Sequence, residues 1–168
     1  MLQPILVVYA SKSGVTVEVA QAIGHVLNQR GQLVDVKPVR DVMRLDGYRG
    51  IVLGSAIRDG CWLPEAMAFL HRFHPDLYVI PTAIFTVHLF NLDDSPRSKA
   101  NRAGYTIPVR ALIHPVAEAF FAGRLEKARL GFLDKVQVTV MEEPDQDWID
   151  WEAISQWAAQ IGPLVGAR

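Results

Sequence analysis

Cysteine, surplus charge and long apolar runs are all scarce in this sequence, and each shortage excludes a class of protein. The 168 residues include one cysteine, so the chain cannot form an internal disulfide or a multi-thiolate zinc or iron–sulfur site. The 17 basic and 18 acidic residues nearly cancel, whereas a nucleic-acid-binding protein would carry a basic face. No apolar stretch approaches the length that spans a bilayer. Because 50% of the residues are hydrophobic, the composition excludes intrinsic disorder and supplies a core.

The first residues also lack the pattern of a secretion signal. Residues 1–4 contain no basic side chain, and the apolar run at 5–8 is too short for the core of a signal peptide. A length of 168 residues suits one ordinary domain. We therefore expect a single cytoplasmic domain over residues 1–168.

Strand-like and helix-like segments alternate along the chain. Apolar, β-branched runs predict five strands, at residues 5–9, 33–37, 50–57, 79–87 and 116–123. Apolar stripes with helical spacing predict helices at 16–30, 64–73, 97–103 and 150–164. Residues 130–141 fit a helix and a strand equally well. Because helical crossovers join parallel strands, the alternation predicts an α/β fold with a doubly wound parallel sheet.

Ligands of such sheets bind at the carboxyl ends of the strands, which here means residues 10–16, 55–62 and the segment from 86 onward. The first of these loops carries the hydroxyls of Ser11, Ser13 and Thr16 around Gly14, just before a predicted helix. Free backbone N–H groups and the positive end of the helix dipole favour a phosphate there. Alternatively, Ser13 caps the helix while Gly14 relieves the turn. Since capping explains one hydroxyl but not three, we predict phosphate binding.

Other nucleotide-binding motifs are missing. There is no G-x-x-x-x-G-K-S/T, which disfavours a P-loop triphosphatase. There is no G-x-G-x-x-G after the first strand, which disfavours a dinucleotide-binding fold. A response-regulator receiver would need acidic residues at the end of the first strand, where Ala10 and Ser11 stand.

The first loop, Ser-Lys-Ser-Gly-Val-Thr at 11–16, resembles the flavodoxin phosphate loop S/T-x-S/T-G-x-S/T. Residues 54–60 (GSAIRDG), 82–89 (TAIFTVHL), 122–125 (AGRL) and 150–152 (DWE) are similar to segments of one flavodoxin-like branch. That branch is the menaquinone-dependent protoporphyrinogen IX dehydrogenase group. The resemblance implies a flavodoxin-like five-stranded sheet in the order 2-1-3-4-5, with helices on both faces.

The resemblance also implies an FMN site at the strand ends that the fold rule picks out. The residues expected to hold the phosphate are Ser11, Lys12, Ser13, Gly14, Val15 and Thr16. Those expected to border the ring are Ser55, Ala56, Ile57, Arg58, Gly60, Trp62, Thr86, Val87, His88, Leu89 and Phe90, with Gly123 and Arg124 on the outer rim. Arg58 and His88 are the candidate catalytic residues, to orient an anionic substrate and to move a proton.

By this resemblance the chain is an FMN-dependent oxidoreductase that takes electrons from a reduced tetrapyrrole and passes them to a quinone or other acceptor. Two alternatives stay open: a non-catalytic electron carrier that serves a redox partner, and a flavin-free binding module. Peripheral contact with the inner face of the membrane and a homodimer also stay open. We expect no nucleic acid and no transmembrane segment.

Several reactive side chains have plainer interpretations. Trp62 either stacks on the flavin or packs in the core, and Arg58 either orients a ligand or pairs with Asp59 or Glu65. Cys61 has no partner thiol, so we expect a packing residue. His71 and His74 lack a third ligand, so we expect no metal site. The tryptophans expected to pack the last helix on the sheet are Trp148, Trp151 and Trp157.

Overall fold

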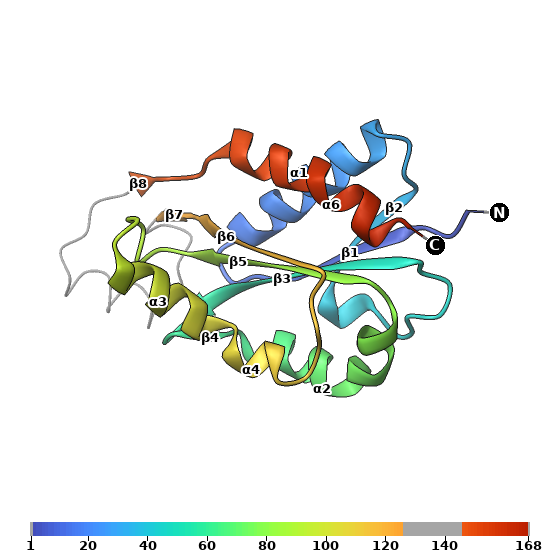
Figure 1. Ribbon diagram of the computed structural model, residues 1–168, viewed down its shortest axis with the longest axis horizontal. Helices are drawn as coiled ribbons and strands as arrows, with labels where there is room; N and C mark the ends of the chain where they lie inside the picture. The colour runs from blue at the N-terminus through green and yellow to red at the C-terminus, as the bar shows by residue number, and fades with distance from the viewer. Residues whose placement is uncertain (1, 126–145, 168) are drawn as a thin grey trace.

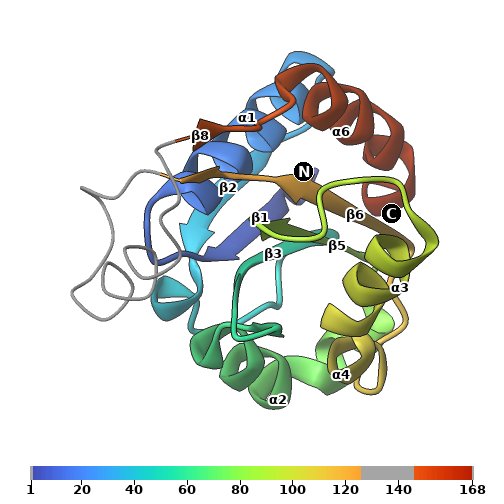
Figure 2. The same cartoon turned by 90° about the vertical axis from the view of Figure 1, so that its left-hand side faces the viewer.

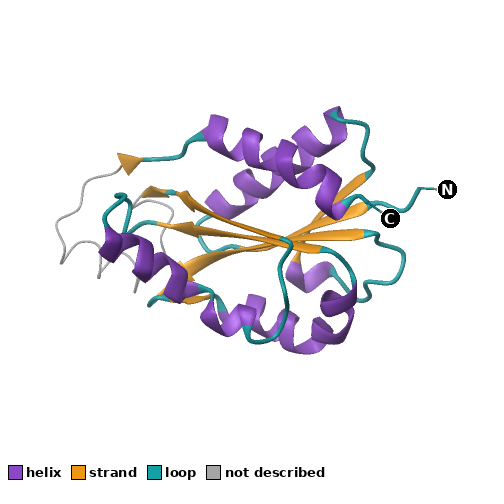
Figure 3. Cartoon of the chain, in the orientation of Figure 1, coloured by secondary structure: helices purple, strands orange, loops and turns teal. Residues whose placement is uncertain are grey.

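The computed structural model describes residues 2–125 and 146–167. Its centre is a parallel sheet with helices on both faces (Figure 1, Figure 3). The parallel strands are β1 (Ile5–Ala10), β2 (Val34–Pro38), β3 (Gly50–Arg58), β5 (Thr82–His88) and β6 (Ala117–Ala122). Their order, β2-β1-β3-β5-β6, is the predicted 2-1-3-4-5 when only these five are counted. The doubly wound flavodoxin-like topology is therefore confirmed.

In the described part of the chain, helices cover both faces of the sheet (Figure 1). The first layer holds α1 (Val15–Gln29) and α6 (Trp151–Val165). The second layer holds η1 (Val39–Asp41), α2 (Pro64–Val79), α3 (Pro96–Tyr105) and α4 (Ile107–Arg110). Figure 2 looks onto the carboxyl ends of the strands, between the two layers.

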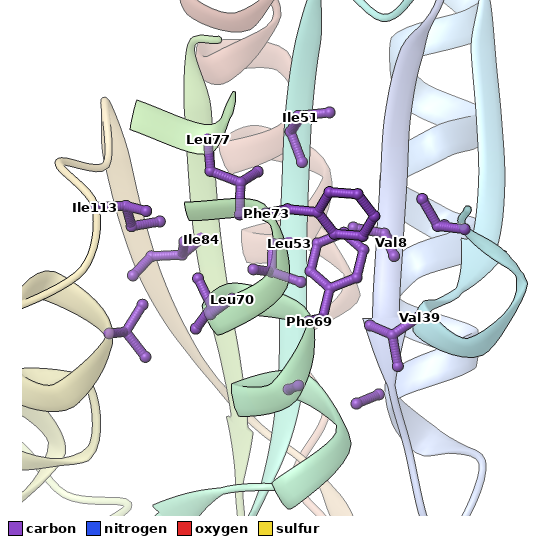
Figure 4. Close-up of a cluster of buried hydrophobic side chains, with 14 of the residues drawn as sticks. Val8, Val39, Ile51, Leu53, Phe69, Leu70, Phe73, Leu77, Ile84 and Ile113 are labelled. Atoms are coloured by element: carbon purple, nitrogen blue, oxygen red, sulfur yellow. The ribbon is translucent and has the colours of Figure 1, made fainter. Parts of the chain in front are cut away.

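The core consists of two apolar clusters, one on each face, because strand side chains alternate in direction. Ile5 and Val7 of β1 join the cluster under α1 and α6, whereas Leu6 and Val8 join the cluster under α2. Figure 4 shows the second cluster, in which Phe69 and Phe73 of α2 lie over the central strands. Strands that are apolar on both faces are what a covered parallel sheet requires.

An aromatic ring from the neighbouring strand lies so close to the middle of β3 that a glycine is required there. A Cβ atom on Gly54 would lie 1.9 Å from the ring of Phe85, which crosses it from β5. Because Gly54 has no side chain, the ring of Phe85 can lie against the backbone of β3.

Some boundaries differ from the prediction. Helix α2 continues to Val79 instead of ending near residue 73, and Pro75 lies inside it. Strand β5 starts at Thr82, three residues after the predicted start at residue 79. A short pair, β7 (Arg124–Leu125) with β8 (Gln146–Asp147), was not predicted. The ambiguous segment 130–141 lies outside the described residues.

An unpredicted hairpin follows β3, because the chain turns back into β4 (Cys61–Trp62). Arg58 pairs with Cys61, so Asp59 and Gly60 form a two-residue turn. Their φ angles are 54° and 73°, as a type I′ hairpin turn requires of both central residues. The Asp-Gly dipeptide is a known signal for this turn, so the sequence did contain the information.

Candidate functional site

A cavity of about 610 Å³ opens at the carboxyl ends of the strands. The predicted site residues that line it are Lys12, Ser13, Val15, Thr16, Ala56, Ile57, Arg58, Gly60, Val87, His88, Leu89, Phe90 and Gly123. The fold thus brings together parts of all three predicted loops. The volume is in the range of small-molecule and cofactor pockets.

A hydrogen bond within the loop between β1 and α1 stabilises the conformation in which this loop borders the cavity. Ser11 Oγ accepts from the backbone N–H of Gly14 at 3.1 Å, and Gly14 is the N-cap residue with φ of 90°. The first helical bond runs from Glu18 N to Gly14 O, so the N–H groups of residues 15–17 have no acceptor within the helix. No side chain caps the helix, so the alternative that Ser13 is the capping residue is wrong. An anion is the natural partner for such a terminus.

Five other predicted residues lie beside the cavity without lining it: Ser11, Gly14, Ser55, Trp62 and Thr86. Trp62 is 3% exposed, and its Nε1–H donates to Thr86 Oγ1 at 2.9 Å. Ser55 Oγ accepts from Leu63 N at 3.1 Å and donates to the carbonyl of Ala56 at 2.8 Å. These bonds fasten the β3–β4 hairpin to β5 and α2. Trp62 is therefore a core residue, in line with the plainer of its two interpretations.

His88 is a buried titratable group of the cavity wall. Its side chain is 5% exposed, and Nδ1 lies 2.8 Å from the carbonyl oxygen of Phe90. A carbonyl only accepts, so Nδ1 carries the proton and Nε2 is the acceptor of the neutral ring. Burial lowers the pKa of His88, and the charge of Arg102 acts in the same direction against the opposing effect of the Phe90 carbonyl. The imidazole is accordingly neutral at pH 7.

The mouth of the cavity combines charge with exposed apolar surface. Arg58 is exposed at the end of β3, and Lys12 lines the opposite loop. Phe90 is 57% exposed and lines the cavity together with Leu92. Asp93 accepts hydrogen bonds from Ser98 and Ser95, which lower the pKa of its carboxyl group.

The segment after β6 forms another wall of the cavity. Arg124 pairs with Glu18 of α1 at 2.9 Å and with Asp147 of β8 at 3.0 Å, so its guanidinium ties the β7–β8 pair to the phosphate-loop helix. The backbone N–H of Trp148 donates to the Gly123 carbonyl at 3.1 Å. Trp148 lines the cavity, so the expectation that it packs the last helix is wrong.

Of the expectations for the other tryptophans and the cysteine, the structure confirms one and contradicts the rest. Trp157 packs on Phe85 and Phe121 as predicted, with ring centroids 6.3 and 5.6 Å away. Trp151 is 40% exposed, so it contributes less to packing than expected. Cys61 is also exposed, which contradicts the packing role assigned to it.

Sequence reasoning missed several residues of the cavity wall. These are Leu63, Asn91, Leu92, Asp93, Ser98, Tyr105, Leu125 and Trp148. Asp59, within the predicted segment 55–62, and Arg124, a predicted rim residue, do line the cavity. Ser98 and Tyr105 reach the cavity from α3, and no local pattern reports which helix face meets a distant strand end.

The described residues contain neither a metal-ligand cluster nor a membrane-spanning helix. Across 2–125 and 146–167, no three His, Cys, Asp or Glu side chains are grouped to hold a metal ion. Within the same ranges, no helix combines the length and the apolar character needed to cross a membrane.

Known proteins resemble this chain in sequence and in fold. A family model described as a flavodoxin domain matches residues 6–148. A protoporphyrinogen IX dehydrogenase (quinone) of Leishmania major is 25% identical over 177 residues, covering 95% of this chain and 74% of that protein. The protein of the same name from Escherichia coli K12 is 23% identical over 172 residues, covering 95% of each. A flavodoxin from the domain Archaea matches with a TM-score of 0.58 at 19% identity, covering 96% of this chain and 98% of that one.

The family match runs through the phosphate loop, the β3–β4 hairpin, the loop after β5 and Gly123, which are the segments that surround the cavity. The solved structures are too distant in sequence to show more than the fold. Both findings agree with the loop motifs and with the strand order. The chain belongs to the flavodoxin domain family, whose fold is that of flavin-dependent electron-transfer proteins.

Proposed function

We propose that the cavity binds FMN, with the phosphate on the loop at 11–16 and the ring between the hairpin at 58–60 and the loop at 89–93. Three features of the cavity fit this cofactor. The turn at the start of α1 offers backbone donors and the hydroxyls of Ser13 and Thr16 to a phosphate. Val87, Leu89 and Phe90 supply apolar surface for a flat ring. The volume of about 610 Å³ suits a cofactor-sized ligand.

The reaction that we propose is the oxidation of a reduced tetrapyrrole with a quinone as final acceptor, as the names of the two relatives suggest. FMN, when bound, supplies the two-electron chemistry between them. The tetrapyrrole loses two electrons and two protons, and the quinone gains the same number to become a hydroquinone. The protein's part is to hold the ligands, exclude water and manage the protons.

Arg58 and His88 are the residues to which we assign roles in this reaction. The neutral Nε2 of His88 accepts a proton that the substrate releases, because the other ring nitrogen is already bonded to Phe90. The guanidinium of Arg58, exposed at the cavity mouth, binds a carboxylate of the substrate. The observation that carries the proposal is the hydroxyl-bearing turn at the start of α1, which lines a cavity with apolar walls.

One observation favours a second function, that of a flavin-dependent electron carrier. Phe90 and Leu92 are apolar, exposed and beside the cavity, where a protein partner could approach the ring. An enzyme stimulates porphyrinogen oxidation by menadione above the rate with free FMN, whereas a carrier does not. The rate with and without the protein, measured anaerobically, separates the two functions.

FMN binding itself is tested by the visible spectrum and by titration of the apoprotein with FMN. A Ser13→Asp substitution places a carboxylate against the phosphate, and we expect FMN affinity to fall about 100-fold, as charge repulsion in a partly desolvated site implies. Riboflavin, which lacks the phosphate, is the matched control ligand and should bind the variant and the wild type alike. A colourless protein with no affinity for FMN would overturn the proposal.

A further inference from the structure

Asn91 has an unusual backbone conformation, and three residues of α3 hold it there. Its φ angle is 58°, in the left-handed region. The side chain of Asn101 donates to Asn91 Oδ1 at 2.9 Å, and Asn91 Nδ2 donates to the hydroxyl of Tyr105 at 2.6 Å. Arg102 donates from Nη1 to the carbonyls of Asn91 and Asp93, at 2.5 and 2.7 Å. Every polar group of the Asn91 side chain is therefore used to join the loop after β5 to α3.

The hydroxyl of Tyr105 accepts one hydrogen bond in this arrangement and can still donate one. A phenol both accepts and donates, and Asn91 occupies an accepting position. Within residues 2–125 and 146–167, the structure shows no acceptor for the Tyr105 O–H proton. Tyr105 is 8% exposed and lines the cavity beside His88, with ring centroids 6.1 Å apart. A bond received from an amide also polarises the phenol and makes it a better donor.

We propose that Tyr105 donates a hydrogen bond from its hydroxyl to a carbonyl oxygen of the conjugated ring in the cavity, and that Asn91 positions it for this. The proposal rests on the proposed function, because it needs a ring that takes up electrons. Strand β5 lies two strands from β1, about 10 Å across the sheet, so a ligand with its phosphate at α1 can present a ring beside His88 and Tyr105.

Such a donor favours the reduced state of its ligand. A flavin ring that gains two electrons and one proton becomes an anion, and part of the charge lies on its carbonyl oxygens. A quinone carbonyl likewise gains charge as its ring takes up electrons. A hydrogen bond to a charged oxygen is stronger than one to a neutral carbonyl, so the ligand binds more tightly once reduced. Flavin and quinone share this chemistry, and the test distinguishes them.

The test compares Tyr105→Phe with Tyr78→Phe in the FMN-loaded protein. Both substitutions remove one hydroxyl, but Tyr78 is 61% exposed at the end of α2 and does not line the cavity. If the ring is the flavin, Tyr105→Phe lowers the preference for reduced over oxidised FMN about tenfold. For a two-electron couple this is a fall of about 30 mV in midpoint potential. Tyr78→Phe should leave the potential unchanged.

A kinetic measurement tests the case in which the ring that accepts the hydrogen bond is a quinone. Reduced protein is reoxidised with menadione, which has carbonyl oxygens, and with ferricyanide, which has none. If the ring is a quinone, Tyr105→Phe slows the menadione reaction about tenfold while the ferricyanide rate and the potential stay the same. An unchanged potential together with unchanged rates for both acceptors would overturn the inference. Failure of the wild type to bind FMN would instead overturn the proposed function.

The positioning role of Asn91 is tested by Asn91→Gly, because glycine tolerates the positive φ angle but has no amide. We expect a change in the same direction as for Tyr105→Phe, but smaller, since the hydroxyl remains while its orientation is lost. If Asn91→Gly behaves as the wild type while Tyr105→Phe does not, Tyr105 acts without a positioning residue and that half of the inference is wrong.

Discussion

At the scale of single residues, the protonation state of His88 is set by the fold around it. The ring is enclosed by the aromatic side chains of Tyr105 and Phe120, and its Nδ1–H is bonded to the Phe90 carbonyl. Desolvation disfavours the charged imidazolium, and the cation of Arg102 disfavours it further. His88 could be named from its position at a strand end. Its neutral state could not, because that depends on side chains contributed by α3 and β6.

The lowered pKa of His88 makes stability depend on pH. The pKa in the folded state lies below the ordinary 6.5, so as pH falls through that value the unfolded chain binds the proton more readily. The free energy of unfolding should therefore decrease between pH 7 and 5.5, by at most about 1.4 kcal/mol per pH unit from this one group. Urea denaturation across this range measures the slope.

The control is a pair of variants, His88→Phe and His25→Phe. His25 is exposed on α1, so its replacement should leave the pH slope as it is in the wild type. The His88→Phe variant should lose the part of the slope below pH 6.5. Equal slopes in the two variants would mean that His88 is not the titrating group.

At the scale of elements, the β3–β4 hairpin shows how a short turn shapes a cavity wall. Asp59 and Gly60 both have positive φ angles, and the turn projects Arg58 at the cavity mouth. Behind it, the bond from Trp62 to Thr86 and the bond from Leu63 N to Ser55 fix the hairpin to its neighbours. The sequence predicted that residues 55–62 border the site. That Trp62 points inward follows from the β4 pairing, which turns the chain back along β3.

Gly60→Ala tests the turn. With φ at 73°, a Cβ atom strains the backbone by about 1–2 kcal/mol, although no neighbouring atom blocks it. We expect a matching loss of unfolding free energy in urea and weaker FMN binding, because the cavity wall shifts. Gly104→Ala on α3 is the comparison, since a helical position without neighbours should gain about 0.5–1 kcal/mol from alanine. The same sign of change in both variants would contradict the role of the turn.

At the scale of the whole molecule, the central strands depend on a contact between Gly54 and the ring of Phe85. The ring fills the place where a side chain on β3 would stand, and it continues into the cluster with Phe121 and Trp157. Because α6 packs on that cluster, the C-terminal helix is coupled to the strands that carry the site. A substitution at Gly54 should therefore lower the free energy of unfolding of the whole core, because the core unfolds cooperatively.

A double-mutant cycle measures this coupling. Gly54→Ala should lower the free energy of unfolding by at least about 1–3 kcal/mol, the usual cost of overpacking a core. Phe85→Leu destabilises the core by itself but removes the obstructing ring. The double variant should be more stable than the sum of the single effects predicts, by at least about 0.5 kcal/mol. Strict additivity would show that the two residues do not compete for the same space.

The sequence by itself determined the fold class, the positions of the five parallel strands and the location of the hydroxyl-rich loop before α1. Each of these follows from local patterns: continuous apolar runs mark strands buried on both faces, and a hydroxyl-rich turn before a helix marks an anion site. The strand order came from the family resemblance, since periodicity does not say which strands are neighbours.

Only the tertiary structure decided which side chains meet across the cavity. Tyr105 and Ser98 arrive from α3, Trp148 from the segment before α6, and Arg124 through its ion pairs with Glu18 and Asp147. It also decided that Trp62 is buried and Cys61 exposed, although the two are adjacent. A sequence pattern reports which face of an element is apolar, whereas the partner of that face depends on how separate elements pack.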